Sequence, residues 1–137
     1  LGGTLSLRGY PLSMVFAEKI ITAIERGVAN TRWRDFADIY LLSGTHEVDG
    51  SELQKSLRVV ADYRRAQRIP LAQALDGFAD LAQSRWRTWI RKQRLTDRLP
   101  DQFADLMEQL FVFADPALQE TKLAAQWNPM RRAWNEL

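Results

Sequence analysis

Apolar residues recur every three or four positions through most of this chain. Two such sets are Leu12, Phe16, Ile20, Ala23 and Ile24, and Phe103, Leu106, Met107, Leu110 and Phe113. This spacing places each set on one face of an α-helix, which can then be buried against other helices. The pattern predicts an all-α helical bundle, with residues 1–137 forming a single domain.

Helix-breaking and helix-capping residues divide the chain into its predicted helices. These run over about 12–26, 32–42, 51–67, 71–75, 78–94 and 100–115, and Asn128-Pro129 is predicted to open a last short helix. Gly27 suits a helix C-cap, and Asn30 or Thr31 suits the next N-cap. Residues 45–50 form a predicted polar loop. The alternation over residues 4–8 predicts one short N-terminal strand, which we expect to belong to the sheet of a missing domain.

Composition narrows the class of protein. The chain has no cysteine, which excludes disulfides and thiolate metal sites and fits a cytoplasmic location. It has no apolar run long enough to span a membrane and no secretory leader. It starts at Leu1 without a methionine, so we interpret it as a fragment of a longer protein.

Two short motifs lie between Tyr10 and Leu42. They are Ala-Glu-Lys at residues 17–19 and Arg-Asp-Phe-Ala-Asp at residues 34–38. In this order and at this spacing they resemble the AbiEii/AbiGii toxins of type IV toxin–antitoxin systems, in which a helix with Ala-Glu-Lys precedes an Arg-Asp-x-x-Asp helix. Residues 113–116 and 127–129 resemble the tail of the same family. The resemblance implies that this chain is the C-terminal helical part of a nucleotidyltransferase-like toxin.

The resemblance also implies an activity, cofactors and partners for the longer protein. Nucleotidyltransferases similar to DNA polymerase β use carboxylates to hold divalent metals, here expected to be Mg²⁺, and these bind an NTP. The implied acceptor is an RNA, such as the tRNA used by some members, and the implied partner is a cognate antitoxin. The alternative is a non-catalytic helical module that contacts RNA or an antitoxin.

The metal-binding motif of this family is a Gly-Ser pair with a downstream aspartate, expected on a sheet that precedes the present chain. Gly2-Gly3-Thr4 does not replace it, because no carboxylate follows at short range. No metal site is therefore expected within this chain, and the chain alone is expected to be inactive.

Cations of the first motif region are candidate ligands of a nucleotide. The resemblance implies a catalytic role for Lys19, because a compact cation can stabilise charge on a triphosphate. Lys19 borders the apolar face of its helix, from where it can reach into a cleft. The alternative is a surface lysine whose aliphatic stem covers apolar residues. Arg26, Arg32 and Arg34 can add positive charge near the phosphates, although all three fit solvated positions better.

Asp35 and Asp38 are the other two candidate catalytic residues. At a spacing of three they share one face of a helix, where they can orient Lys19 or assist a metal. The alternative is a pair of surface salt bridges, from Arg32 to Asp35 and from Arg34 to Asp38. The resemblance favours a role in the active site, and it favours Asp35 over Asp38.

A basic stripe lies further along the chain. Arg87, Arg91 and Arg94 fall at helical spacing with few acids nearby, which is consistent either with weak RNA binding or with a solvated face. Trp86 and Trp89 lie on the other side of this helix. Their spacing favours a place in the core over stacking on bases.

Overall fold

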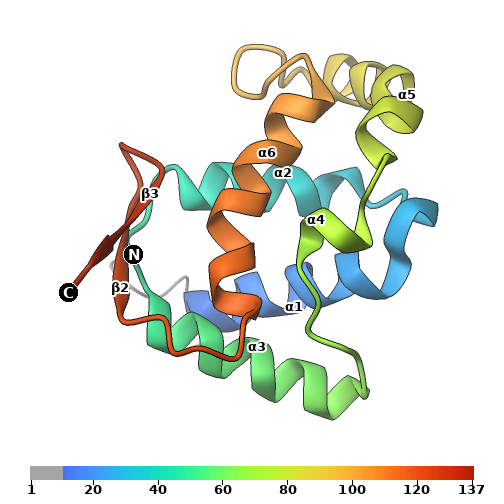
Figure 1. Ribbon diagram of the computed structural model, residues 1–137. Coiled ribbons are helices and arrows are strands. Elements are labelled where there is room, and N and C mark those ends of the chain that lie inside the picture. Colours follow the sequence, from blue (N-terminus) through green and yellow to red (C-terminus); the bar gives the residue numbers. More distant parts are fainter. Residues whose placement is uncertain (1–10) are drawn as a thin grey trace.

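The computed structural model describes residues 11–137, and in these residues helices dominate (Figure 1). The α-helices are α1 (Leu12–Arg26), α2 (Trp33–Ser43), α3 (Gly50–Arg64), α4 (Leu71–Ala74), α5 (Phe78–Lys92) and α6 (Phe103–Ala114). The 3₁₀ helices η1 (Gly27–Ala29) and η2 (Asp115–Leu118) follow α1 and α6. No helix in this range is long and apolar enough to cross a membrane. The strand predicted at residues 4–8 lies outside the described residues.

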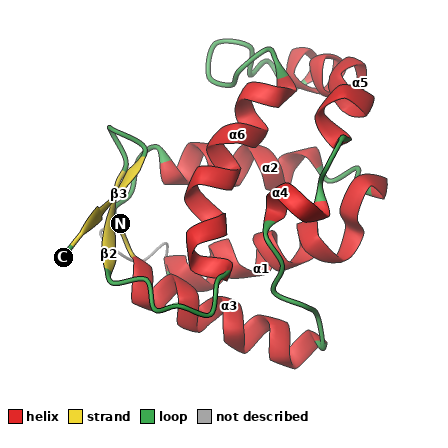
Figure 2. Cartoon of the chain, in the orientation of Figure 1, coloured by secondary structure: helices red, strands yellow, loops and turns green. Residues whose placement is uncertain are grey.

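The predicted helical fold is confirmed in its main part, but a small antiparallel sheet shows that the fold is not purely all-α. It lies at the left of the helices in Figure 2 and consists of β1 (Val48–Asp49), β2 (Ala125–Asn128) and β3 (Ala133–Glu136), in that order. β1 occupies part of the predicted polar loop. Strands of two to four residues are too short for their periodicity to be recognised in a sequence, which explains the error.

The helix predicted from Asn128-Pro129 is instead the turn between β2 and β3. The side-chain oxygen of Asn128 accepts hydrogen bonds from the backbone N–H groups two and three residues further on, as in an Asx turn. Trp127 and Trp134 pair across the hairpin, with ring centroids 5.2 Å apart. Aromatic cross-strand pairs of this kind stabilise an antiparallel ladder.

The predicted helix ends were accurate at α1 and less so at α2. Gly27 follows α1 with a φ of 54° and donates its N–H to the carbonyl of Ala23, so the predicted C-cap is confirmed. Neither Asn30 nor Thr31 caps α2. The Asn30 side chain accepts the N–H of Arg32 instead, and α2 begins one residue later without a side-chain cap.

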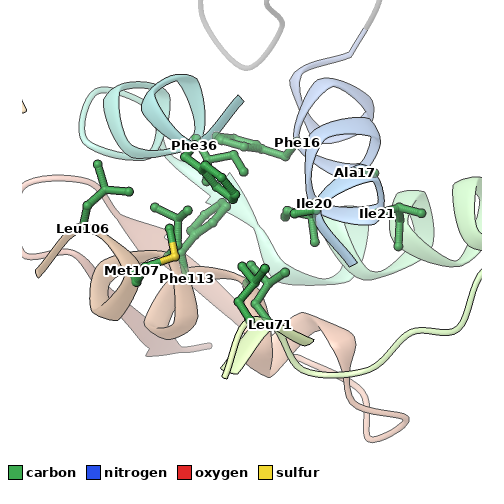
Figure 3. Packing of buried hydrophobic residues seen from close by; sticks show 14 of the residues in the cluster. Phe16, Ala17, Ile20, Ile21, Phe36, Leu71, Leu106, Met107 and Phe113 are labelled. Carbon is green, nitrogen blue, oxygen red and sulfur yellow. The ribbon is translucent and has the colours of Figure 1, made fainter. Parts of the chain in front are cut away.

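The core lies where α1, α2, α3, α4 and α6 meet. Figure 3 shows Phe16 of α1, Phe36 of α2 and Phe113 of α6 directed into this interior, with Leu71 of α4 beside them. The rings of Phe16 and Phe113 lie 4.7 Å apart, measured between centroids. A second aromatic group, centred on Phe103, joins α2, α5 and the start of α6. Buried residues of α1 and α2 also pack on each other in this core, which matters for the site below.

The segment that leads into β2 packs over the first turn of α3. The buried amide of Gln54 donates hydrogen bonds to the carbonyls of Gln119 and Thr121 and accepts one from the N–H of Leu123. A Cβ atom added at Gly50 would lie 2.7 Å from the carbonyl oxygen of Leu123. This close approach to backbone requires glycine at position 50.

We expect Gly50→Ala to lower the free energy of unfolding by about 1–3 kcal/mol, the usual result of overpacking. The gain in helix propensity, up to about 1 kcal/mol, is too small to offset this. Glu52→Ala is the matched control, because Glu52 is an exposed position in the same first turn of α3. Urea unfolding followed by circular dichroism measures both. Equal losses would show that the approach to Leu123 is not tight.

Candidate functional site

Lys19 of α1 lies between the two aspartates of α2. Its Nζ donates hydrogen bonds to Oδ1 of Asp35 at 3.2 Å and to Oδ2 of Asp38 at 3.0 Å. The two carboxylates can both reach Lys19 because one helical turn separates them and α1 packs on α2. Asp35 is 7% exposed, whereas Lys19 and Asp38 are half-buried. The structure thus brings the three candidate catalytic residues together.

Asp35 is held by a second cation. Arg32 donates its Nε–H to Oδ2 of Asp35 at 2.7 Å, which is the ion pair predicted from their spacing. Both carboxylate oxygens of Asp35 therefore accept hydrogen bonds from charged donors, an arrangement that is stronger than neutral bonding. Asp35 is well placed to fix the position of the Lys19 ammonium.

A pocket of about 240 Å³ opens beside Lys19, between α1, the start of α2 and the end of α3. Its lining consists of Val15, Glu18, Lys19, Thr22, Arg32, Asp35 and Arg64. Three of these side chains are cations and two are carboxylates. Because the walls carry both charges and polar groups, the pocket suits a polar, phosphate-sized ligand better than an apolar one.

Arg64 is a pocket residue that the sequence motifs did not identify. It donates hydrogen bonds to Thr22 Oγ1 at 2.7 Å and to Glu25 Oε1 at 3.1 Å, and it also forms an ion pair with Glu18. Its partners on α1 lie about forty residues earlier in the chain. Helical periodicity places Arg64 in the last turn of α3, but it does not reveal which surface of α1 that turn meets.

The carboxylates of this site do not fit a magnesium centre. Within residues 11–137 no group of three acidic or histidine side chains is placed to hold a metal ion. The Lys19 ammonium lies between Asp35 and Asp38, and both oxygens of Asp35 are already engaged. Mg²⁺ requires near-octahedral oxygen coordination. The described residues therefore hold Lys19 in place but do not supply the ligands of a metal ion.

A Gly-Ser pair does occur in this chain, at residues 50–51, with Asp62 further on. Both belong to α3, where Gly50 is the first residue and Asp62 is exposed near the far end. Twelve residues of helix separate the two positions by about 18 Å. This pair therefore cannot act as the strand-borne Gly-Ser and aspartate motif of nucleotidyltransferases.

The structure does not bring Arg26 or Arg34 into the pocket. Arg26 is exposed in the last turn of α1. Arg34 points to α5, where it donates a hydrogen bond to Gln93 at 3.0 Å and its guanidinium lies 5.1 Å from the ring centroid of Trp89. The salt bridge between Arg34 and Asp38, which the alternative interpretation proposed, does not form, because Asp38 binds Lys19 of α1 and Arg34 binds Gln93 at the end of α5.

The basic stripe of α5 is partly neutralised. Arg87 forms a two-pronged salt bridge with Asp101, at 3.2 Å from Nε and 3.0 Å from Nη2. The local sequence suggested few acids near the stripe, but Asp101 reaches Arg87 because the chain turns back along α5 after this helix. Arg91 and Arg94 are exposed, and Arg94 lies beyond the helix end with a φ of 55°. Trp86 is fully buried, which confirms its predicted place in the core.

Two titratable groups outside the pocket have shifted pKa values. Burial lowers the pKa of the Arg132 guanidinium, which donates hydrogen bonds to the carbonyl of Tyr40 and the hydroxyl of Ser43 at the end of α2. Burial raises the pKa of the Asp115 carboxyl, although bonds from backbone N–H groups of α4 oppose that shift. Both groups join elements of the fold, and neither lines the pocket.

A family model described as "Nucleotidyl transferase AbiEii toxin, Type IV TA system" matches residues 2–132. No curated protein and no solved structure shows a significant match to the chain. The matched region includes both motif helices, the pocket and β2.

Proposed function

The chain belongs to the AbiEii nucleotidyl transferase toxin family of type IV toxin–antitoxin systems, and on this premise we propose that it is the C-terminal helical part of a toxin that transfers a nucleotide from an NTP to an RNA, with tRNA as the first acceptor to test. The observation that carries the proposal is the Lys19 ammonium, held by two aspartates at the edge of a polar pocket. Membership of this family also implies an antitoxin as partner.

Lys19 is proposed to bind a phosphate of the nucleotide. A lysine ammonium has three N–H donors, and two of them are directed to Asp35 and Asp38. The third donor has no partner within residues 11–137 and can point to a ligand in the pocket. Negative charge develops on phosphate oxygens during nucleotidyl transfer, so a cation already in place stabilises the transition state without reorganisation.

Asp35 and Asp38 are proposed to be positioning residues that act through Lys19. Asp35 has the stronger role, because it is more buried and is itself fixed by Arg32. Arg32 uses only its Nε–H on Asp35, which leaves its terminal N–H groups for a phosphate. Arg64 also lines the pocket, but its charge is engaged by Glu18 and Glu25, so it helps to position α3 against α1.

A bound divalent metal would supply further stabilisation of the phosphate charge. The carboxylates described above do not fit such an ion. We therefore propose that the metal ligands of the complete toxin lie outside residues 11–137, in line with the position of the Gly-Ser motif in this family.

Nucleotide binding tests the role of Lys19. In the full gene product we expect Lys19→Gln to weaken binding of a radiolabelled NTP at least about tenfold, because a charged hydrogen bond contributes about 1.5–3 kcal/mol. Equilibrium dialysis measures this. Lys55→Gln is the matched control, since it removes the same charge from an exposed position of α3.

The same preparation gives a second readout. With magnesium, labelled NTP and tRNA, the 137-residue chain alone is expected to form no transfer product, whereas the full gene product forms it. Turnover by the isolated chain would place the metal ligands within it. Unchanged NTP affinity in Lys19→Gln would instead remove Lys19 from the binding site.

A further inference from the structure

Three cations lie along the seam where α2 meets α5, and we call this group the basic seam. Its members are Arg34, Arg85 and Lys92, all of them exposed. None forms a salt bridge with any acid in residues 11–137. Arg85 and Lys92 are two helical turns apart and so share one side of α5. The seam is therefore a surface of uncompensated positive charge.

Aromatic rings hold the two arginines of the seam in place. The guanidinium of Arg34 lies 5.1 Å from the centroid of Trp89, and that of Arg85 lies 6.0 Å from the centroid of Trp33. Arg34 also donates a hydrogen bond to Gln93. Cation–π contacts restrict a guanidinium without neutralising it. Because these side chains are already restricted, they lose less conformational entropy when a ligand binds than mobile surface arginines would.

The contrast with Arg87 separates the seam from the rest of α5. Arg87 lies on another side of the helix, where Asp101 engages its guanidinium through two hydrogen bonds. An anion that approached Arg87 would have to compete with this carboxylate. The positive charge available to a polyanion therefore lies on the side of α5 that faces α2.

The basic seam adjoins the Lys19 site through α2. Arg34 precedes Asp35 directly and lies one turn before Asp38, the two residues that bind Lys19. A long anion on the seam would thus pass close to the pocket. From Arg85 to Lys92 the charge extends about 10 Å along α5, which suits a polymer with repeated phosphates better than a single phosphate group.

We propose that the basic seam binds the phosphodiester backbone of the RNA acceptor and directs it to the Lys19 pocket. The choice of RNA rests on the proposed function, whereas the position of the surface rests on the contacts above. Guanidinium groups present paired N–H donors that match phosphate oxygens. Binding to phosphates releases counterions, so the affinity must depend on salt.

Fluorescence anisotropy with a labelled RNA hairpin and the full gene product tests this surface. R34Q/R85Q is expected to weaken RNA binding about tenfold and to reduce the slope of log affinity against log salt by about 0.7–0.9 for each lost phosphate contact. The matched control is K55Q/R58Q, which removes two exposed charges from α3. It is expected to bind RNA like the wild type.

A second variant controls for an effect of the change at Arg34 on the neighbouring pocket. R85Q/K92Q alters only α5, and we expect weaker RNA binding with unchanged NTP affinity. Wild-type RNA affinity in both seam variants would overturn the proposal, and so would an equal loss in K55Q/R58Q. Because RNA binding is measured without NTP, failure of the seam leaves the Lys19 test of the proposed function unaffected.

Discussion

Lys19→Ala is expected to abolish the toxicity of the full gene product while leaving its fold intact. The substitution removes the cation held beside the pocket by Asp35 and Asp38. Loss of one such contact to a transition state lowers the rate about 10²–10³-fold, by analogy with the removal of an oxyanion-hole donor. Growth of an expressing bacterial culture measures toxicity, and transfer of labelled nucleotide to tRNA measures the rate.

Substitutions of the two aspartates are expected to reduce the rate to different extents. Asp35→Asn is expected to reduce the rate nearly as far as Lys19→Ala, because Asp35 engages both Lys19 and Arg32. Asp38→Asn is expected to reduce the rate less, since its one contact with Lys19 is more exposed. Growth arrest at wild-type strength by Lys19→Ala, at equal expression, would mean that these ion pairs are only structural.

Phe113→Ala is expected to lower the free energy of unfolding by about 3–5 kcal/mol, the usual cost of truncating a buried phenylalanine. Phe113 is 1% exposed, and its ring centroid lies 4.7 Å from that of Phe16, 4.8 Å from Trp127 and 5.7 Å from Trp134. The substitution leaves a cavity between α1, α6 and the hairpin. Urea unfolding followed by circular dichroism measures the loss.

Phe111→Ala is the control for helix propensity and side-chain size. Phe111 lies on the same helix but is only half-buried, so its removal exposes less apolar surface and leaves no closed cavity. We expect Phe111→Ala to lower the free energy of unfolding clearly less than Phe113→Ala does. Equal losses for the two variants would show that the aromatic contacts of Phe113 add no stability beyond ordinary burial.

Helices were predictable from the sequence because their signals are local. Apolar spacing placed α1, α5 and α6 within a few residues of their observed bounds, and Gly27 marked the end of α1. The hairpin was missed because its short strands are stabilised by contacts with β1 and with α2, far away in the sequence. Only the folded chain shows that Asn128 starts a turn.

Those residues of the candidate site that belong to the two sequence motifs could be predicted. Resemblance identified Lys19, Asp35 and Asp38, and the structure brings them together, although their chemical roles stay predictions. Arg64 was missed because it belongs to the site only through the packing of α3 on α1. Spacing along α2 allowed a salt bridge between Arg34 and Asp38, but Arg34 contacts Gln93 and Trp89 instead, and only the packing of the helices shows this.

The C-terminal hairpin determines when α2 can be completed during folding. Trp127 donates its indole N–H to the carbonyl of Ser43, and Arg132 donates to that of Tyr40, so the last turn of α2 receives these bonds from residues made much later. Contacts between such distant segments form slowly, and a ribosome delivers them after α1, α2 and α3. The helix that carries Asp35 and Asp38 therefore gains these bonds at its last turn only after synthesis has passed residue 132. A nascent chain that stalls before this point carries the motif residues on a helix whose last turn still lacks these two hydrogen bonds.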